Sequence, residues 1–255
     1  MKNTITHAII LAAGLGTRLK PITDHSPKCL TEVNGKPVLL NTLENLAASG
    51  ITQCTIVTGY LKDKITKTAG SSRNGVEIRY TENRAYHKTN DMYSLWLARE
   101  VLVSGAVILE GDIFFRANTL KEALRDMDDR SFYLAGRYPG KPDEVILTTD
   151  RDKNIRSIEV LRGGAFLNAC ETGGNTFMSS GILTVRPEYG KSLHRWLQAE
   201  VDTGNTNVLF DDVIGMHATE LPLSVYEIGD DDWVEIDTPE DLYRAETIFT
   251  NDRAR

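Results

Sequence analysis

The chain has 255 residues and a formal net charge of −7 at neutral pH. This length is enough for one large α/β domain or two small ones, and for a sizeable core. The acidic balance, with no cluster of lysine or arginine, argues against a nucleic-acid partner. No apolar run approaches the length of a membrane span and the first residues lack the apolar core of a signal peptide, so we expect no membrane partner. Cys29, Cys54 and Cys170 are isolated and predict thiols in a reducing cytoplasm, not disulfides or a zinc site.

The first half of the chain alternates predicted strands and helices. Short apolar runs that end at glycine or polar residues predict strands, and amphipathic segments between them predict helices. In chain order we expect a strand at 8–11, a turn at 34–35, a helix at 37–49, a strand at 54–58, a helix at 61–69, a strand at 76–80, a helix from 91 or 92 to 103, a strand at 106–112, a helix from 118 or 119 to 127 and a strand at 132–136. This order indicates a largely parallel sheet with helices on both faces, which binds ligands at the carboxyl ends of its strands.

The second half begins with antiparallel patterns. We expect a hairpin of strands 145–147 and 155–161, a short strand between the glycine pairs 163–164 and 173–174, a strand at 177–185, helices at 187–199 and 207–216, strands at 223–228 and 233–237, and a helix from 238 to about 249. We interpret residues 132–185, approximately, as an antiparallel insert on the substrate side of a single domain, 1–255, because no linker sets it apart. The predicted fold class is α/β: a three-layer αβα, Rossmann-like mixed sheet, mostly parallel, with that insert.

The most informative stretch follows the first strand. Gly14 and Gly16 let the backbone approach an anion closely, and Arg18 and Lys28 add two cations. Two unit charges about 4 Å apart interact by roughly 4 kcal/mol at an effective dielectric near 20. A polyphosphate is therefore the expected ligand, and a tight turn is the competing interpretation of the glycines alone. The spacing is neither that of a P-loop nor of a dinucleotide-binding G-x-G-x-x-G, because Leu19 stands at the third glycine position.

Two aspartates each follow an apolar strand. Asp112 closes Glu110-Gly-Asp112, and Asp237 closes Glu235-Ile-Asp237. If one sheet edge brings them together, the pair can hold Mg²⁺ against a triphosphate. Taken singly, Asp112 is also explained as a turn residue and Asp237 as the start of the following helix.

The stretch from Gly14 to Lys28 resembles the signature loop of the nucleotidyltransferases that make nucleotide-diphospho sugars and CDP-alcohols, G-x-G-[ST]-R followed by P-K. The similarity covers nearly the whole chain, and within that superfamily it points to the small bacterial cytidylyltransferases that act on phosphocholine or 2-aminoethylphosphonate. It is carried by the segments 14–28, 57–59, 90–95, 111–112, 180–181 and 235–237.

The resemblance implies roles for individual residues. The nucleotide is expected against Leu11, Ala12, Ala13, Gly14, Gly16 and Thr17, with Gly59 and Ser94 beside the base. Arg18 and Lys28 are expected to hold its phosphates, and Asp112 and Asp237 a Mg²⁺ ion; these four form the expected catalytic set.

The acceptor site is less closely defined. Phosphocholine enzymes of the family resemble aromatic-cage binders, in which a tryptophan faces the quaternary ammonium, whereas Val145 stands at the corresponding position here. Glu144 and Asp211 are candidates to pair with a primary ammonium, and Ser180 is a further candidate contact. Solvated acids on a loop and a helix are the competing interpretation.

A different cage, built from Tyr86, Tyr93 and Trp96, is the arrangement that would still favour choline. The leading hypothesis is a cytidylyltransferase that moves CMP from CTP to a small phosphonate such as 2-aminoethylphosphonate and releases pyrophosphate. Phosphocholine is the alternative acceptor, followed by a sugar-1-phosphate. The other class, a non-catalytic nucleotide-binding relative, would be expected to have lost a phosphate cation or a metal carboxylate. The resemblance makes CTP and the acceptor the expected partners and leaves the oligomeric state open.

Overall fold

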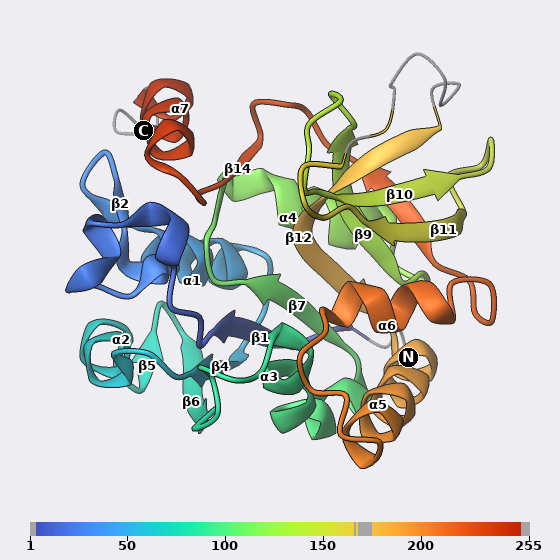
Figure 1. Ribbon diagram of the computed structural model, residues 1–255, viewed down its shortest axis with the longest axis horizontal. Coiled ribbons are helices and arrows are strands. Elements are labelled where there is room, and N and C mark those ends of the chain that lie inside the picture. Colours follow the sequence, from blue (N-terminus) through green and yellow to red (C-terminus); the bar gives the residue numbers. More distant parts are fainter. Residues whose placement is uncertain (1–3, 166, 168–174, 251–255) are drawn as a thin grey trace.

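The computed structural model describes residues 4–165, 167 and 175–250. The chain is organised around a ten-stranded sheet (Figure 1). Its main path is, in spatial order, β11 (Ile155–Val160), β10 (Val145–Thr149), β12 (Thr176–Val185), β7 (Ala106–Glu110), β1 (His7–Ala12), β4 (Gln53–Thr58), β6 (Val76–Glu82) and β5 (Ser72–Arg73), while β9 (Phe132–Arg137) pairs with β12 and with β13 (Ser224–Glu227). Strands β7, β1, β4 and β6 are parallel, and β12 runs antiparallel to β7. The predicted mixed sheet is confirmed, and β12 lies inside it beside β7.

Helices cover both faces of this sheet (Figure 1). One face carries α1 (Val38–Ala48), α2 (Lys62–Ala69) and α4 (Ala117–Asp126), and the other carries α3 (Asp91–Leu97), α5 (Pro187–Asp202) and α6 (Phe210–Met216). The last helix, α7 (Pro239–Ile248), packs on a smaller apolar cluster, and short 3-10 helices occupy Thr17–Leu19, Ile22–Asp24, Lys28–Leu30 and Arg99–Ser104. Among the described helices, none combines the length and the apolar character that crossing a bilayer requires.

The two main cores follow from the alternation of side chains along buried strands. In β1, Ala8, Ile10 and Ala12 belong to the core under α1, whereas Ile9 and Leu11 belong to the core under α3 and α5. Successive strand residues point to opposite faces, so a strand covered on both sides reads as a continuous apolar run. This is why the sequence of β1 is a continuous apolar run and does not alternate between apolar and polar residues.

Two small ribbons lie outside the large sheet. The hairpin of β2 (Glu32–Val33) and β3 (Lys36–Pro37) turns at Asn34 and Gly35, whose φ angles are 51° and 80°, as the Asn-Gly pair predicts. The second ribbon pairs β8 (Ile113–Phe115) with β14 (Trp233–Glu235) in antiparallel fashion. It joins segments that are far apart in the sequence.

Several predicted bounds differ from the structure. The strand expected to end at 112 stops at Glu110, and β8 follows it; the strand expected at 233–237 stops at Glu235. The helix expected to reach 103 ends at Leu97 and continues as a 3-10 helix that contains Val101 and Val103, because β-branched residues disfavour the α-helix. The helix expected from 207 begins at Phe210. The short strand expected between 164 and 173 lies largely outside the described residues.

Candidate active site

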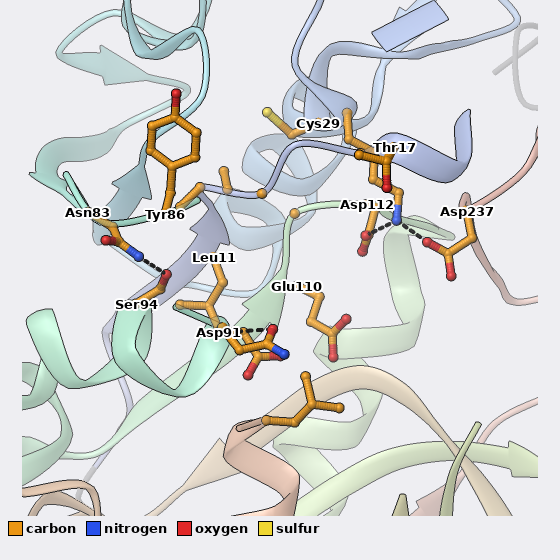
Figure 2. A pocket seen from close by; sticks show the side chains of 18 of the residues that line it. Leu11, Thr17, Cys29, Asn83, Tyr86, Asp91, Ser94, Glu110, Asp112 and Asp237 are labelled. Atoms are coloured by element: carbon orange, nitrogen blue, oxygen red, sulfur yellow. Dashed lines mark hydrogen bonds and ion pairs between the residues drawn. The ribbon is translucent and has the colours of Figure 1, made fainter. Parts of the chain in front are cut away.

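A cleft with a cavity volume of about 310 Å³ opens at the carboxyl ends of β1, β6 and β7 (Figure 2). This is the edge at which parallel sheets of this kind bind ligands. Most of the residues predicted for the site line it, namely Leu11, Ala12, Ala13, Gly14, Gly16, Thr17, Arg18, Lys28, Ser94, Asp112 and Asp237.

Contacts with Thr23 and Lys28 hold the loop after β1 in place. Gly16 has a φ of +65°, its carbonyl accepts a 2.7 Å hydrogen bond from the Thr23 hydroxyl, and a Cβ there would lie 3.0 Å from Cβ of Lys28. A side chain at this position would therefore be strained and crowded. Leu19 is fully buried among Val234 and other residues of the small apolar cluster. Its role as an anchor explains why no third glycine stands there.

The two predicted cations meet the two predicted aspartates in the cleft. The Lys28 ammonium donates hydrogen bonds to both Asp112 and Asp237, and Nη2 of Arg18 lies 2.6 Å from Oδ2 of Asp237. The pairing of β8 with β14, with a bond from the Ile236 amide to the Asp112 carbonyl, brings the aspartates together. Burial lowers the pKa of Lys28, but attraction to Asp112 and Asp237 outweighs it and raises the pKa above its ordinary value. The ammonium therefore stays charged.

The opposite end of the cleft is polar. The buried Asn83 donates 3.0 Å hydrogen bonds to the hydroxyls of Ser94 and Thr89, which orients Ser94 (Figure 2). Gly59 does not line the cleft; it lies behind Ala13, because a Cβ at Gly59 would be 2.7 Å from the Ala13 carbonyl oxygen. Tyr86 lines this end, so the wall combines one aromatic ring with hydrogen-bonding groups.

The three residues predicted for the acceptor separate in the structure. Ser180 is fully buried at a bulge in β12 and donates to the Leu134 carbonyl. Asp211 is 1% exposed and accepts a 2.7 Å hydrogen bond from the Tyr133 hydroxyl, so neither residue lines the cleft. Glu144 lines a small adjoining hollow that shares Glu235 with the cleft. Burial, which the sequence does not show, separates Ser180 and Asp211 from the cleft surface.

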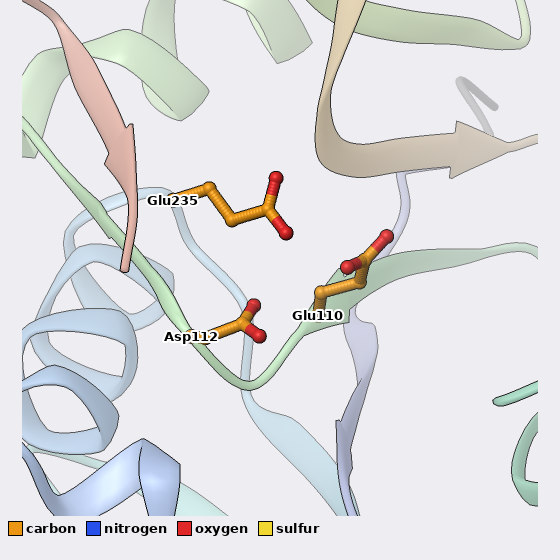
Figure 3. Close-up of side chains that lie close together, drawn as sticks. All are labelled: Glu110, Asp112 and Glu235. Carbon is orange, nitrogen blue, oxygen red and sulfur yellow. The ribbon is translucent and has the colours of Figure 1, made fainter. Parts of the chain in front are cut away.

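Sequence reasoning missed several residues that line the cleft. The most important are Glu110 and Glu235, whose carboxylate oxygens lie within 4.8 Å of each other and of an Asp112 oxygen (Figure 3). Each ends a strand and stands two residues before a predicted aspartate. This E-x-D pattern was the available signal. Asn83 and Asp91 also line the cleft, and no comparable pattern marks them.

The alternative aromatic cage does not form among the described residues. Tyr93 stacks on Trp96 with 5.2 Å between ring centroids, Arg99 covers the Trp96 ring, and the indole N–H donates to Gln198. Tyr93 and Trp96 do not line the cleft, whereas Tyr86 does. These rings support one another on α3 and do not surround a ligand with Tyr86.

The cysteines behave as structural thiols where they are described. Cys29 and Cys54 are buried and free, and burial raises the pKa of Cys29, which borders the cleft, to about 12. A protonated thiol is a weak nucleophile, so Cys29 does not supply covalent chemistry. Cys170 lies outside the described residues.

The buried Asp211 predicts a pH-dependent stability. Burial raises the pKa of Asp211 to about 7, although the hydrogen bond from Tyr133 acts to lower it. The pKa of an aspartate in the unfolded chain is about 3.9. The folded state therefore retains a proton that the unfolded state releases, and stability falls as the pH rises from about 4 to about 7. The Asp211→Asn variant keeps an acceptor for Tyr133 without the charge. We expect it to exceed the wild type in stability by on the order of 1–3 kcal/mol at pH 8 and to differ little at pH 4.

Urea unfolding at pH 4 to 8 measures this difference. The exposed Asp63 provides the control Asp63→Asn, which should show no such pH dependence. A constant offset between Asp211→Asn and the wild type at every pH would contradict the prediction.

The fold and the cleft define an α/β protein in which a glycine-containing loop and two cations lie beside paired carboxylates. The family model for nucleotidyl transferases matches residues 7–144, and the chain belongs to that family. The 2-aminoethylphosphonate cytidylyltransferase of Lancefieldella rimae is 29% identical to it, over 93% of this chain and 90% of that protein. The choline-phosphate cytidylyltransferase of Streptococcus pneumoniae is also 29% identical, over 96% of this chain and 99% of that protein.

Two further proteins are similar to this chain over almost its whole length. The CMP-5'-(3-aminopropyl)phosphonate synthase of Streptomyces rubellomurinus is 31% identical over 96% of this chain, which spans 39% of that longer protein. A solved structure of the CTP:phosphocholine cytidylyltransferase from Streptococcus pneumoniae superposes with a TM-score of 0.80 at 27% identity, covering 96% of this chain and 100% of that one. The similarity thus extends over nearly the whole of this chain.

Proposed function

We propose that this chain is a Mg²⁺-dependent cytidylyltransferase that transfers CMP from CTP to a small amine-bearing phosphonate, with 2-aminoethylphosphonate as the leading acceptor, and releases pyrophosphate. The observation that carries the proposal is the contact of Lys28 with Asp112 and Asp237 beside the glycine loop. The names of the cytidylyltransferase relatives support CTP and an amine-bearing acceptor. In this proposal residues 1–255 act as one domain in the cytoplasm.

The carboxylates of the cleft suit a hard divalent cation. Asp112 and Asp237 offer oxygen ligands, which Mg²⁺ prefers, and both line the cleft where Lys28 joins them. We assign the metal to Asp112 and Asp237. When bound, Mg²⁺ supplies positive charge to the triphosphate and to the leaving pyrophosphate.

The chain's own residues bring two anions together. Residues 11–14 and Ser94 line the nucleotide, and Arg18 and Lys28 offset the repulsion between CTP and the acceptor and the charge that develops on the leaving group. An acceptor oxygen attacks the α-phosphorus in line, and the bond to the β-phosphate oxygen breaks, so that pyrophosphate leaves with the electron pair. A phosphonate and a phosphomonoester both carry an ionised oxygen at neutral pH, and the second pKa of a phosphomonoester is about 6. No general base is required, which agrees with a cleft whose described lining contains no histidine.

Phosphocholine is the second candidate acceptor because two of the comparisons name phosphocholine enzymes. A quaternary ammonium is bound best by several aromatic faces. The described lining of the cleft contains one aromatic ring, that of Tyr86, at the end with Asn83 and Ser94. The structure therefore favours an acceptor that makes hydrogen bonds, and a sugar-1-phosphate ranks third.

A screen of pyrophosphate release tests the proposal. It crosses the four NTPs with 2-aminoethylphosphonate, 2-hydroxyethylphosphonate, phosphocholine and glucose-1-phosphate, with and without Mg²⁺. We expect the fastest release from CTP with 2-aminoethylphosphonate and none without the metal. Release from UTP or dTTP with the sugar phosphate, together with none from CTP and the phosphonate, would overturn the proposal.

A further inference from the structure

Three carboxyl groups converge beside the proposed metal pair. Glu110 ends β7, Glu235 ends β14, and Asp112 lies between β7 and β8. Glu235 stands opposite Ile113 in the β8–β14 ribbon, so the ribbon that joins the aspartates also turns the two glutamates toward each other (Figure 3). Oxygens of the three carboxylates lie within 4.8 Å of one another. We call Glu110, Asp112 and Glu235 the carboxylate triad.

The triad has acceptors that nothing in the described chain satisfies. Oδ2 of Asp112 is bonded to Lys28, whereas Oδ1 of the same group is buried without a partner. The side chains of Glu110 and Glu235 make neither a hydrogen bond nor an ion pair with any described residue. Both residues are half-buried, and a charge that loses water without gaining a partner is costly, so the free protein holds three open acceptor groups at one point of the cleft.

Several acidic side chains lie around the triad. Asp91 lines the same cleft, and Asp112 belongs both to the triad and to the proposed metal pair. Arg18 and Lys28 are paired with Asp237 and with Oδ2 of Asp112. The cleft beside Glu110 and Glu235 therefore suits a cationic group of the acceptor.

We propose that the carboxylate triad recognises the primary ammonium of the acceptor, with Glu110, Oδ1 of Asp112 and Glu235 each accepting one N–H. This inference rests on the proposed function and defines the acceptor as a primary amine. A primary ammonium has three donors, which match the three open acceptors. A trimethylammonium has no N–H donor, so it would leave all three carboxylates unsatisfied. Asp112 then faces the reacting phosphates through one oxygen and the amine through the other.

The variants Glu110→Gln and Glu235→Gln test the inference because they keep the side-chain size and remove one charge each. We expect kcat/KM for 2-aminoethylphosphonate to fall roughly 10- to 100-fold, as for the loss of a hydrogen bond to a charged group. The kcat/KM for 2-hydroxyethylphosphonate should change less than about threefold, and the KM for CTP should be unaltered. The exposed Glu77 provides the control Glu77→Gln, and circular dichroism verifies folding.

An unchanged ratio of kcat/KM between the amine and the hydroxyl acceptor in both variants would overturn the inference. If the variants then also bind Mn²⁺ more weakly, the triad is assigned to a second divalent ion instead. Failure of the proposed function looks different, because the wild type would then release no pyrophosphate from CTP with any amine-bearing acceptor. Calorimetric binding of 2-aminoethylphosphonate against ethylphosphonate then decides the inference: amine-dependent binding that is lost in the Gln variants supports it, and equal binding of both compounds overturns it.

Discussion

The Asp112→Asn variant is expected to lose activity by roughly a thousandfold in kcat, equivalent to about 4 kcal/mol of transition-state stabilisation. The carboxylate contacts Lys28 through one oxygen and presents a buried, unpartnered oxygen to Glu110 and Glu235. An amide keeps the shape and one oxygen but removes the charge that would hold a divalent cation. The change removes repulsion from the two glutamates but also one ion pair of Lys28, so the two effects oppose each other and the thermal midpoint should change little. Pyrophosphate release and thermal unfolding measure the two effects.

The exposed Asp63 again gives the matched control, since Asp63→Asn changes the same functional group far from the cleft. Near-normal turnover by Asp112→Asn would show that our metal assignment is wrong. A large fall in its thermal midpoint would instead show that Asp112 serves the fold.

The Lys28→Met variant is expected to lose activity by a similar factor and to change how the free protein responds to Mg²⁺. Lys28 bonds both aspartates, and its side chain and theirs are only 16% and 15% exposed. Removing one partner of a fully buried pair costs about 3–5 kcal/mol, so we expect about 2–3 kcal/mol here because some solvent reaches the pair. With the lysine gone, Asp112 and Asp237 face each other with less compensation, and Mg²⁺ without nucleotide should raise the thermal midpoint more than it does in the wild type.

Thermal unfolding with and without Mg²⁺, in the absence of CTP, measures this difference. Lys20 pairs with Asp24 at the surface, where the side chains are 58% and 41% exposed, so Lys20→Met should cost less than about 1 kcal/mol. The prediction fails if Mg²⁺ stabilises Lys28→Met and the wild type equally.

The conformation of the glycine loop after β1 and its place in the cleft were predicted from the sequence because their determinants are local. Gly16 adopts the left-handed backbone that a glycine permits, and the cations that follow it reach the cleft. The Thr238 cap of α7 is equally local, since its hydroxyl accepts from the Asp241 amide three residues later. Such features depend on a few adjacent residues, so a single sequence shows them.

We predicted that Asp112 and Asp237 lie together, but the structure brings them together in a different way. We expected one sheet edge to bring them together, but β14 is not part of the large sheet. It pairs with β8, which the sequence did not mark as a separate strand. With three residues, β8 is too short to show the alternation of side chains by which a strand is predicted. Its pairing with β14 is therefore seen only in the folded chain.

Burial decided which acidic and hydroxyl residues reach the cleft. Ser180 and Asp211 were predicted contacts and lie in the interior, where Leu134 and Tyr133 satisfy them. Glu110 and Glu235 were passed over, although each precedes a predicted aspartate by two residues. A serine or carboxylate looks the same in a sequence whether it faces a ligand or a core.

The sequence by itself determined the order of strands and helices, the glycine loop and the two cations that follow it, because backbone preference and short-range spacing act along the chain. Only the tertiary structure decided that Lys28 lies between Asp112 and Asp237 and that Glu110 and Glu235 converge beside them. Those contacts join residues more than 80 positions apart through the β8–β14 ribbon. Charges interact through space, so their balance in the cleft depends on how distant segments pack.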